Sequence, residues 1–349
     1  MTVGAMFAAA AAATVAFPRP GQTLPPVSKT YVSGSVPRGT SSLTVQGRPV
    51  EIYRTGGWVT MADVSSGTNF VEIAADGFVT NVAIVVEAPP RPAGPPAPPK
   101  RYGKLPYAGD LQRPHPCGKP ASETLVFLDP GHGGPKDTGA VSPHGYFEKE
   151  ANLLLAREVR RALLAMGYRV EMTRDADIAL ELLERPRRAH EIGADCYVSL
   201  HHNATQCDKD PREIRYTSVY RWNGIGERLA AAISRRTGAA LSGDIPDNGV
   251  MKANFAVTRS PEVPSCLVEA DFITTPEGEE AIWNAARRRR IAEAIALGID
   301  DWRRSSAPGD DGGDASEGAG AVRGTESGDG GGEAPGGVLP GSGATKPAP

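Results

Sequence analysis

Residues 125–134 read LVFLDPGHGG, in which four consecutive apolar residues precede a glycine-rich segment that carries a histidine. A short apolar run of this kind is typical of a strand that is buried on both faces of a sheet. Segments with helical periodicity separate it from further apolar runs at 168–173, 196–200, 218–220 and 266–268. This alternation predicts an α/β domain with a mostly parallel sheet, a three-layer domain over residues 123–303.

Four segments carry the helical pattern. In Glu150–Met166, apolar residues recur on one stripe, and Gly167 is a typical stop signal. A helix over 275–302 is expected to begin at Pro276, with acidic residues in its first turn. The other two helices are expected over 179–192 and 226–236.

Polar side chains follow the predicted strands at the points where they end. His132 follows the first strand, and His201 and Glu269 stand at the ends of two later strands. Because the carboxyl ends of parallel strands meet at one edge of a sheet, these side chains are expected to converge there. Glu148 opens the first long helix and therefore starts near the same edge.

Two histidines and two carboxylates at one edge predict a metal site. Imidazole and carboxylate suit zinc, and three protein ligands leave a fourth position for water. A second carboxylate that does not bind the metal can move the proton of that water to a leaving nitrogen. The spacing thus predicts a metal-assisted hydrolase, but Glu150 competes with Glu148, and His202 competes with His201.

The same residues carry a family resemblance. The span VFLDPGHGGPKDTGAVSPHGYFEKEANLLLAREVRRALLAMGYRVEMTR, with RPRRAHEIGADCYVSLHHNA and PSCLVEADFITTPEGEE, resembles the zinc-dependent N-acetylmuramoyl-L-alanine amidases of bacterial cell-wall turnover. The resemblance covers roughly the whole α/β region. It implies one Zn²⁺ held by His132, Glu148 and His201, with Glu269 as the catalytic carboxylate. Its register selects Glu148 and His201, and it leaves His202 where the family usually has a small residue.

The resemblance also implies a substrate and a reaction. The substrate would be peptidoglycan, cleaved at the amide between the lactyl group of N-acetylmuramic acid and L-alanine, in wall remodelling, daughter-cell separation or lysis. Two competing interpretations stay open: a zinc peptidase that cuts within the stem peptide, and a non-catalytic wall-binding protein. Asp129 and Asp137 flank the histidine loop and could either orient a ligand or stabilise turns.

Residues 26–90 read as a small all-β sandwich. Short runs rich in β-branched and aromatic residues, including 50–53, are separated by turn residues. The stretch resembles the bacterial immunoglobulin-like repeats of secreted surface enzymes, and it could serve as a spacer or contact the wall. Residues 91–122 are a proline-rich linker expected to hold the two domains apart, and residues 304–349 are expected to be a disordered tail.

Residues 1–20 predict a signal peptide, since the apolar stretch from Ala5 to Phe17 has the length of its core and small residues surround Val15 and Ala16. No basic residue precedes that stretch, so an alanine-rich cytoplasmic extension is the competing interpretation. A signal peptide would make the protein exported, to the periplasm or cell envelope. No other segment is expected to span a membrane.

The net charge of −3 favours no polyanionic partner such as nucleic acid. The run Arg287 to Arg290 lies within a helical pattern and is expected to be a solvated helix face. Of the four cysteines, Cys196 and Cys266 lie in strand-like runs and are expected to be buried thiols. A disulfide between Cys117 and Cys207 stays open.

Overall fold

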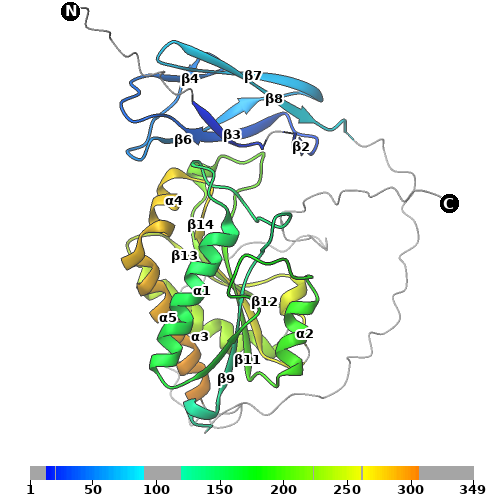
Figure 1. Cartoon of the computed structure of the whole chain (residues 1–349), viewed down its shortest axis with the longest axis vertical. Helices are drawn as coiled ribbons and strands as arrows, with labels where there is room; N and C mark the ends of the chain where they lie inside the picture. Colours follow the sequence, from blue (N-terminus) through cyan, green and yellow to red (C-terminus); the bar gives the residue numbers. More distant parts are fainter. Residues whose placement is uncertain (1–12, 20, 90–118, 223, 261, 306–349) are drawn as a thin grey trace, which may run out of the picture.

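The computed structural model describes residues 13–19, 21–89, 119–222, 224–260 and 262–305. These residues form an α/β domain and a β-sandwich that lies on one end of it (Figure 1). The expected linker and tail fall outside the described residues except at 119–122 and 304–305. Lys119 pairs with Asp195 at 2.7 Å, so the last linker residues already belong to the α/β domain.

The α/β domain is built on a six-stranded sheet in the order β10-β9-β11-β14-β12-β13. Its strands are β9 (Leu125–Pro130), β10 (Arg169–Met172), β11 (Cys196–Asn203), β12 (Thr217–Arg221), β13 (Asp247–Lys252) and β14 (Ser265–Phe272). β10, β9, β11 and β14 are parallel, whereas β12 pairs antiparallel with β14 and parallel with β13. The predicted mostly parallel sheet is confirmed.

Strand β9 shows why the domain has three layers. Val126 and Leu128 belong to one hydrophobic core, and Leu125 and Phe127 belong to the core on the opposite face. Helices α1 (Glu148–Ala165), α3 (Glu227–Leu241) and α5 (Ala285–Arg304) cover the first face, and α2 (Glu184–Glu191) covers the second (Figure 1). Both faces of the strand are buried because the chain alternates strand and helix, as expected.

Three expected element boundaries are wrong. The expected helix over 275–302 is interrupted at Asn284, which is extended (φ −69°, ψ 111°) and caps α5 after α4 (Pro276–Trp283). Helix α3 extends to Leu241 and not to residue 236, and a Cβ on Gly238 would lie 2.1 Å from Asp247 Oδ2. That glycine permits close packing and does not end the helix. Helix α2 begins at Glu184 and not at Ala179.

The β-sandwich consists of two sheets around one core. The first is β1 (Thr14–Phe17), β3 (Lys29–Ser35) and β6 (Gly57–Asp63); the second is β2 (Thr23–Leu24), β8 (Phe78–Val86), β7 (Gly67–Ala75), β4 (Leu43–Val45) and β5 (Arg48–Pro49). Trp58 and Val32 from the first sheet share a core with Val71 and Ile84 from the second. The expected sandwich is therefore present, although 50–53 forms no strand.

The sandwich begins earlier in the chain than expected. Strand β1 pairs antiparallel with β3, and Phe17 stacks on Tyr31 with ring centroids 4.2 Å apart. The domain thus begins at or before Thr14 and not at residue 26. Strand β1 contains Val15 and Ala16, so cleavage beside them would cut this strand, and the signal peptide over residues 1–20 stays a prediction. Residues 1–12 lie outside the described residues.

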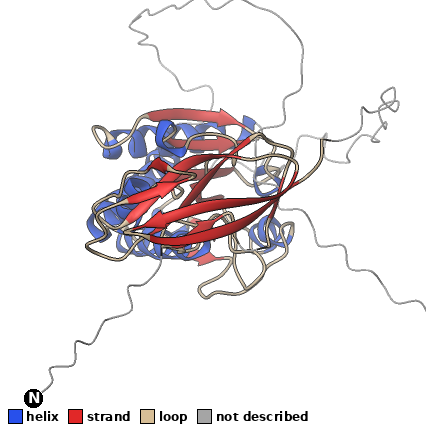
Figure 2. Cartoon of the chain, turned by 90° about the horizontal axis from the view of Figure 1, so that it is seen from above, coloured by secondary structure: helices blue, strands red, loops and turns tan. Residues whose placement is uncertain are grey.

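The sandwich is docked on the α/β domain, contrary to the expectation that the linker holds the two apart. Val141 of the α/β domain is buried in the sandwich core, and Phe147 packs against the same core. Tyr31 N donates to Cys207 O at 2.9 Å across the boundary. Seen from above in Figure 2, the sandwich strands cross in front of the helices of the α/β domain. Apolar burial and a backbone hydrogen bond therefore join the two domains.

Polar side chains add to this interface. The His144 ring lies between Glu279 Oε2 (2.8 Å from Nδ1) and Thr55 O of the sandwich (3.2 Å from Nε2). Arg54 of the sandwich forms an ion pair with Glu280 in α4. These contacts link the sandwich to α4 and to the loop before α1.

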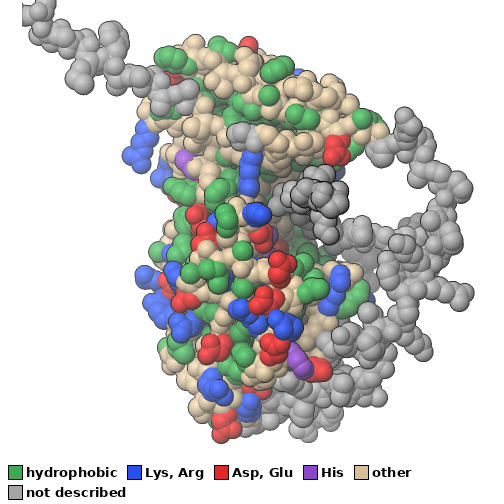
Figure 3. Space-filling view, turned by 45° about the vertical axis from the view of Figure 1, so that its right-hand side comes forward, with side chains coloured by type: hydrophobic (Ala, Val, Ile, Leu, Met, Phe, Trp, Pro, Cys, Tyr) green, Lys and Arg blue, Asp and Glu red, His purple; other side chains and the backbone are tan. Residues whose placement is uncertain are grey.

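The arginine run is paired and is not simply a solvated face. Arg287 is only 7% exposed, and its Nη2 lies 2.8 Å from Asp271 Oδ2. Arg290 pairs with Asp244. On the face that Figure 3 displays, Lys and Arg side chains are interspersed with Asp and Glu over the α/β domain. At least two arginines of the run are therefore paired with carboxylates of the same domain.

The described cysteines are free thiols. Cys196 and Cys266 are fully buried, as expected, and burial raises the pKa of both thiols. Cys207 lies half-buried at the domain interface, and Cys117 lies outside the described residues. None of the helices in the described part of the chain combines the length and apolar character that a bilayer crossing requires.

Candidate metal centre

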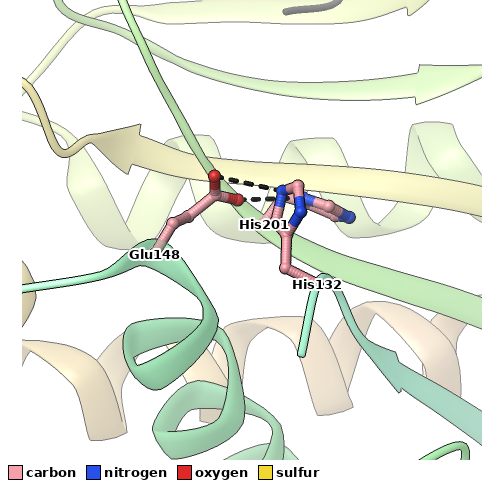
Figure 4. Close-up of side chains that lie close together, drawn as sticks. All are labelled: His132, Glu148 and His201. Atoms are coloured by element: carbon pink, nitrogen blue, oxygen red, sulfur yellow. Dashed lines mark hydrogen bonds and ion pairs between the residues drawn. The ribbon is translucent and has the colours of Figure 1, made fainter. Parts of the chain in front are cut away.

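Three side chains from distant parts of the sequence converge at the carboxyl edge of the sheet (Figure 4). His132 lies in the loop after β9, Glu148 is the first residue of α1, and His201 lies near the end of β11. One potential ligand atom from each lies within 4.8 Å of the others. The expected convergence is thus observed for these three residues.

Glycines allow the histidine loop to fold tightly against β11. His132 has a positive φ of 62°. A Cβ on the preceding Gly131 would lie 2.1 Å from the His201 ring, so only glycine fits there. Arg185 Nη2 donates to His132 O at 2.9 Å and thus restrains the loop backbone.

Asp137 orients the His132 ring. Its Oδ1 lies 2.6 Å from His132 Nδ1, while Nε2 points to Glu148 Oε2 at 3.2 Å. A carboxylate on the outer nitrogen leaves Nε2 as the nitrogen available to a metal. Asp137 therefore holds the His132 ring in place, which is compatible with the ligand-orienting role that the sequence left open.

Glu148 is held as a carboxylate. It is 5% exposed, and its Oε1 lies 2.9 Å from His201 Nδ1, while Oε2 accepts from Ala140 N at 3.0 Å. Burial alone would raise the pKa of Glu148, but His132 and His201 outweigh it and hold the pKa well below its usual range. An ionised carboxylate is the form that binds a metal.

Glu269 lies beside the cluster without belonging to it. It is the register partner of His201 on β14, yet it is not among the three clustered residues. Its buried Oε2 has no hydrogen-bond partner among the described residues. Burial, followed by repulsion from Glu148, raises the pKa of Glu269 well above its usual value. A carboxyl group with a free oxygen can take up and release a proton during a reaction.

Residues 126–301 match the sequence profile of a protein family described as N-acetylmuramoyl-L-alanine amidase. The chain belongs to this amidase family. It is 31% identical over 233 residues to the N-acetylmuramoyl-L-alanine amidase AmiC of Neisseria meningitidis serogroup B, a match that covers 54% of this chain and 55% of that protein. It is 32% identical over 224 residues to the amidase AmiA of Salmonella typhimurium, covering 52% of this chain and 76% of that protein.

A solved structure in the same family also resembles the α/β domain. The N-acetylmuramoyl-L-alanine amidase AmiC2 of Nostoc punctiforme is 34% identical, with a TM-score of 0.49, and the match covers 52% of this chain and 98% of that one. The chain spans about half the length of the meningococcal relative. We refer to residues 123–304 below as the amidase domain and to residues 14–89 as the sandwich.

The structure shows where Glu150 and His202 lie, the two residues that competed with Glu148 and His201 in the sequence. Glu150 is exposed and accepts from Phe147 N at 3.2 Å, so it caps α1. His202 is buried, its Nδ1 lies 2.8 Å from Asn152 Oδ1, and burial lowers its pKa to about 4. His202 is therefore a buried neighbour of the cluster and not a surface residue.

Asn152 is a site residue that the sequence reasoning missed. Its Nδ2 donates to Glu148 Oε1 at 3.0 Å, and its Oδ1 faces His202. Its place four residues after Glu148, on the same helical face, was the available signal. Asn152 restrains the carboxylate from within α1.

Asp129, near the end of β9, stabilises the start of the histidine loop. Its carboxylate accepts hydrogen bonds from Thr173, Arg185, Tyr197 and Ser199 at 2.5–2.8 Å. Asp129 is fully buried, so this network fixes the end of β9 where the histidine loop begins. Its role is structural support of the loop, the second of the two roles left open.

The donor set of the cluster fits zinc. Two imidazole nitrogens and one carboxylate oxygen match a three-ligand site with an open position. The side-chain exposure of 26% for His132 and 16% for His201 leaves the cluster accessible to a substrate. Burial lowers the pKa of His132, but Glu148 and Asp137 raise it overall to about 10, so metal binding must release that proton.

Proposed function

We propose that this chain is a zinc-dependent N-acetylmuramoyl-L-alanine amidase that cleaves the amide between the lactyl group of N-acetylmuramic acid and L-alanine in peptidoglycan. The observation that carries the proposal is the His132, Glu148 and His201 cluster, with Glu269 beside it, inside a family match over residues 126–301. One Zn²⁺ per amidase domain is held by those three ligands. Zinc, when bound, supplies Lewis-acid activation of water and of the substrate carbonyl.

Glu269 acts as the general base and then as the general acid. Its unpartnered Oε2 accepts a proton from the attacking water. It then delivers that proton to the amide nitrogen as the C–N bond breaks. The products are a carboxylate on the lactyl group and a peptide with a free L-alanine amine, so the reaction consumes one water molecule.

The remaining residues of the site hold the ligands in place. Asp137 keeps the His132 ring oriented, and Asn152 and Ala140 N hold the carboxylate of Glu148. Partners of this kind keep metal ligands in one rotamer. Peptidoglycan lies outside the cytoplasm, so we propose that the protein is exported to the cell envelope and acts in wall remodelling, daughter-cell separation or lysis.

The products released from purified wall sacculi test the proposal. We expect zinc-loaded protein to release stem peptides whose new amine belongs to L-alanine, identified by amine labelling and mass spectrometry. A new amine on another stem residue would identify a zinc peptidase. Binding to sacculi without any new amine would identify a non-catalytic wall-binding protein.

A further inference from the structure

One side chain of the sandwich reaches the loop that surrounds the metal ligands. Arg19 Nη1 donates to Thr138 Oγ1 at 2.8 Å, and Nη2 donates to Gly139 O at 2.7 Å. The Arg19 backbone is itself fixed, because its N donates to Gln22 Oε1 at 3.0 Å and its O accepts from Gln22 N at 2.9 Å. The guanidinium therefore extends from a residue whose backbone N and O are both hydrogen-bonded to Gln22.

Segment 138–140, to which Arg19 is hydrogen-bonded, lies directly against Glu148. Ala140 N donates to Glu148 Oε2 at 3.0 Å, and Glu148 N donates back to Ala140 O at 2.9 Å. Lys149 N donates to Thr138 O at 3.2 Å. Segment 138–140 thus binds both the side chain of Glu148 and the backbone at the start of α1.

Gly139 leaves no room between this segment and the cluster. Its φ is +66°, and a Cβ there would lie 2.6 Å from Glu148 Oε2 and 2.7 Å from His132 Cδ2. The backbone whose carbonyl Arg19 holds is therefore packed against two proposed ligands. A shift of segment 138–140 would be transmitted to both of them.

Arg19 also contacts the other end of the same loop. Its guanidinium lies 5.1 Å from the centroid of the Phe147 ring, and Phe147 immediately precedes Glu148. A guanidinium at this distance from an aromatic ring is attracted to it. One side chain from the sandwich thus contacts both ends of the loop that precedes Glu148.

We propose that Arg19 is a positioning residue for the zinc site, so that the sandwich completes the metal-binding loop and is not merely a spacer or a wall contact. This inference rests on the proposed zinc amidase function. Arg19 acts through segment 138–140 and Phe147 and does not itself contact the cluster. Residues that orient metal ligands typically change metal affinity by 10–100-fold when replaced.

The same interface offers a matched control. Arg54 also joins the sandwich to the amidase domain, but it pairs with Glu280 in α4, and its side chain is 80% exposed. Among the described residues, the ion pair of Arg54 is with Glu280 in α4, whereas Arg19 donates two hydrogen bonds to segment 138–140. Replacement of Arg54 therefore reports what the loss of an ordinary interface arginine does.

The experiment compares the full-length wild type with Arg19→Met and Arg54→Met. Methionine keeps an apolar stem of similar length and removes the donors. Zinc affinity is measured by competition with a chromophoric chelator, and the melting temperature is measured in parallel. We expect Arg19→Met to raise the zinc Kd about tenfold, and Arg54→Met to leave it unchanged. A zinc Kd within twofold of wild type in folded Arg19→Met would overturn the inference, whatever its melting temperature.

A second variant keeps the test decisive if Arg19→Met does not fold. Thr138→Val removes one acceptor of Arg19 and leaves the sandwich intact, and we expect it to weaken zinc binding severalfold. An unchanged zinc Kd in Thr138→Val would then overturn the inference. A wild type that cleaves the lactyl amide with zinc while the variants bind zinc equally well would refute this inference alone. A wild type that binds no zinc would refute the proposed function as well.

Discussion

His201 and Glu269 stand opposite each other as register partners on the adjacent parallel strands β11 and β14. Both strands end at this edge of the sheet, so a histidine of the three-residue cluster lies beside a carboxyl group whose Oε2 has no hydrogen-bond partner among the described residues. His201 belongs to the three-residue cluster and Glu269 does not. Metal binding and proton transfer are therefore assigned to different residues in the proposed function. Each task can therefore be removed without the other.

The first prediction concerns Glu269. Glu269→Gln should retain zinc and lose hydrolysis by about 10²–10⁴-fold, the usual contribution of general acid–base catalysis. Zinc content by elemental analysis and amine release from sacculi measure the two properties. Glu171→Gln on β10, where the carboxylate is exposed, is the control and should behave as wild type. Full activity in Glu269→Gln would refute its role as general base.

The second prediction concerns the ligands. His201→Ala should lose both zinc and activity, because an open three-ligand site has no spare partner. The loss of zinc affinity should exceed the roughly 10–100-fold that removal of an outer partner costs. His190→Ala, which removes an exposed imidazole paired with Glu262 on the far side of the domain, should leave both unchanged. Zinc retained at wild-type affinity in His201→Ala would exclude His201 as a ligand.

The cluster at the carboxyl edge of the sheet was predictable, because each sequence feature that indicates it lies within a short stretch of the chain. The apolar run of β9, the glycines around His132 and the helix that starts at Glu148 are visible in short windows of sequence. The rule that parallel strands end at one edge then brings distant residues together. Asn152 shows how far this reasoning extends, since its helical spacing from Glu148 was available but its hydrogen bond was not.

Docking of the sandwich could not be predicted in the same way. Arg19 and Thr138 are 119 positions apart, and neither lies in a periodic pattern that indicates a partner. The proline-rich composition of 91–122 indicates the stiffness of a linker but not whether the domains on either side touch. The apolar run that ends at Phe17 is equally compatible with a signal-peptide core and with strand β1. In each case the deciding contact is tertiary.

A third prediction concerns stability and pH. Asp129→Asn would leave the buried Arg185 without its counter-charge, which should cost about 3–5 kcal/mol of unfolding free energy at pH 7. Asp175→Asn removes an exposed partner of Arg157 and should cost at most about 1 kcal/mol. Urea denaturation of the three proteins measures both differences. Equal costs for the two variants would contradict the assigned role of Asp129.

The pH dependence of that difference has a definite sign. Burial alone would raise the pKa of Asp129, but Arg185, Tyr197 and Thr173 lower it overall below its ordinary value. A carboxyl group whose folded pKa lies below its unfolded pKa of about 3.9 contributes its stability above that unfolded value. The contribution is lost as the pH falls through the folded pKa. The difference in unfolding free energy between wild type and Asp129→Asn should therefore be constant near neutral pH and should shrink below about pH 4. A difference that grows on acidification would refute the role assigned to Asp129.

The last prediction concerns the amino-terminal processing that the proposed export implies. Strand β1 pairs Thr14 with Ser35 and Val15 with Gly34, and a Cβ on Gly34 would lie 1.9 Å from Thr14 O, so the strand is packed tightly in place. Processing after Ala16 would remove most of β1 and leave the edge of β3 unpaired, at about 1 kcal/mol for each lost hydrogen bond. We therefore expect the mature protein to begin before Thr14, as read by amino-terminal mass spectrometry. A chain that starts at residue 17 should melt at least about 4 °C below one that starts at residue 13. A mature terminus at Phe17, with an unchanged melting temperature, would show that β1 is dispensable.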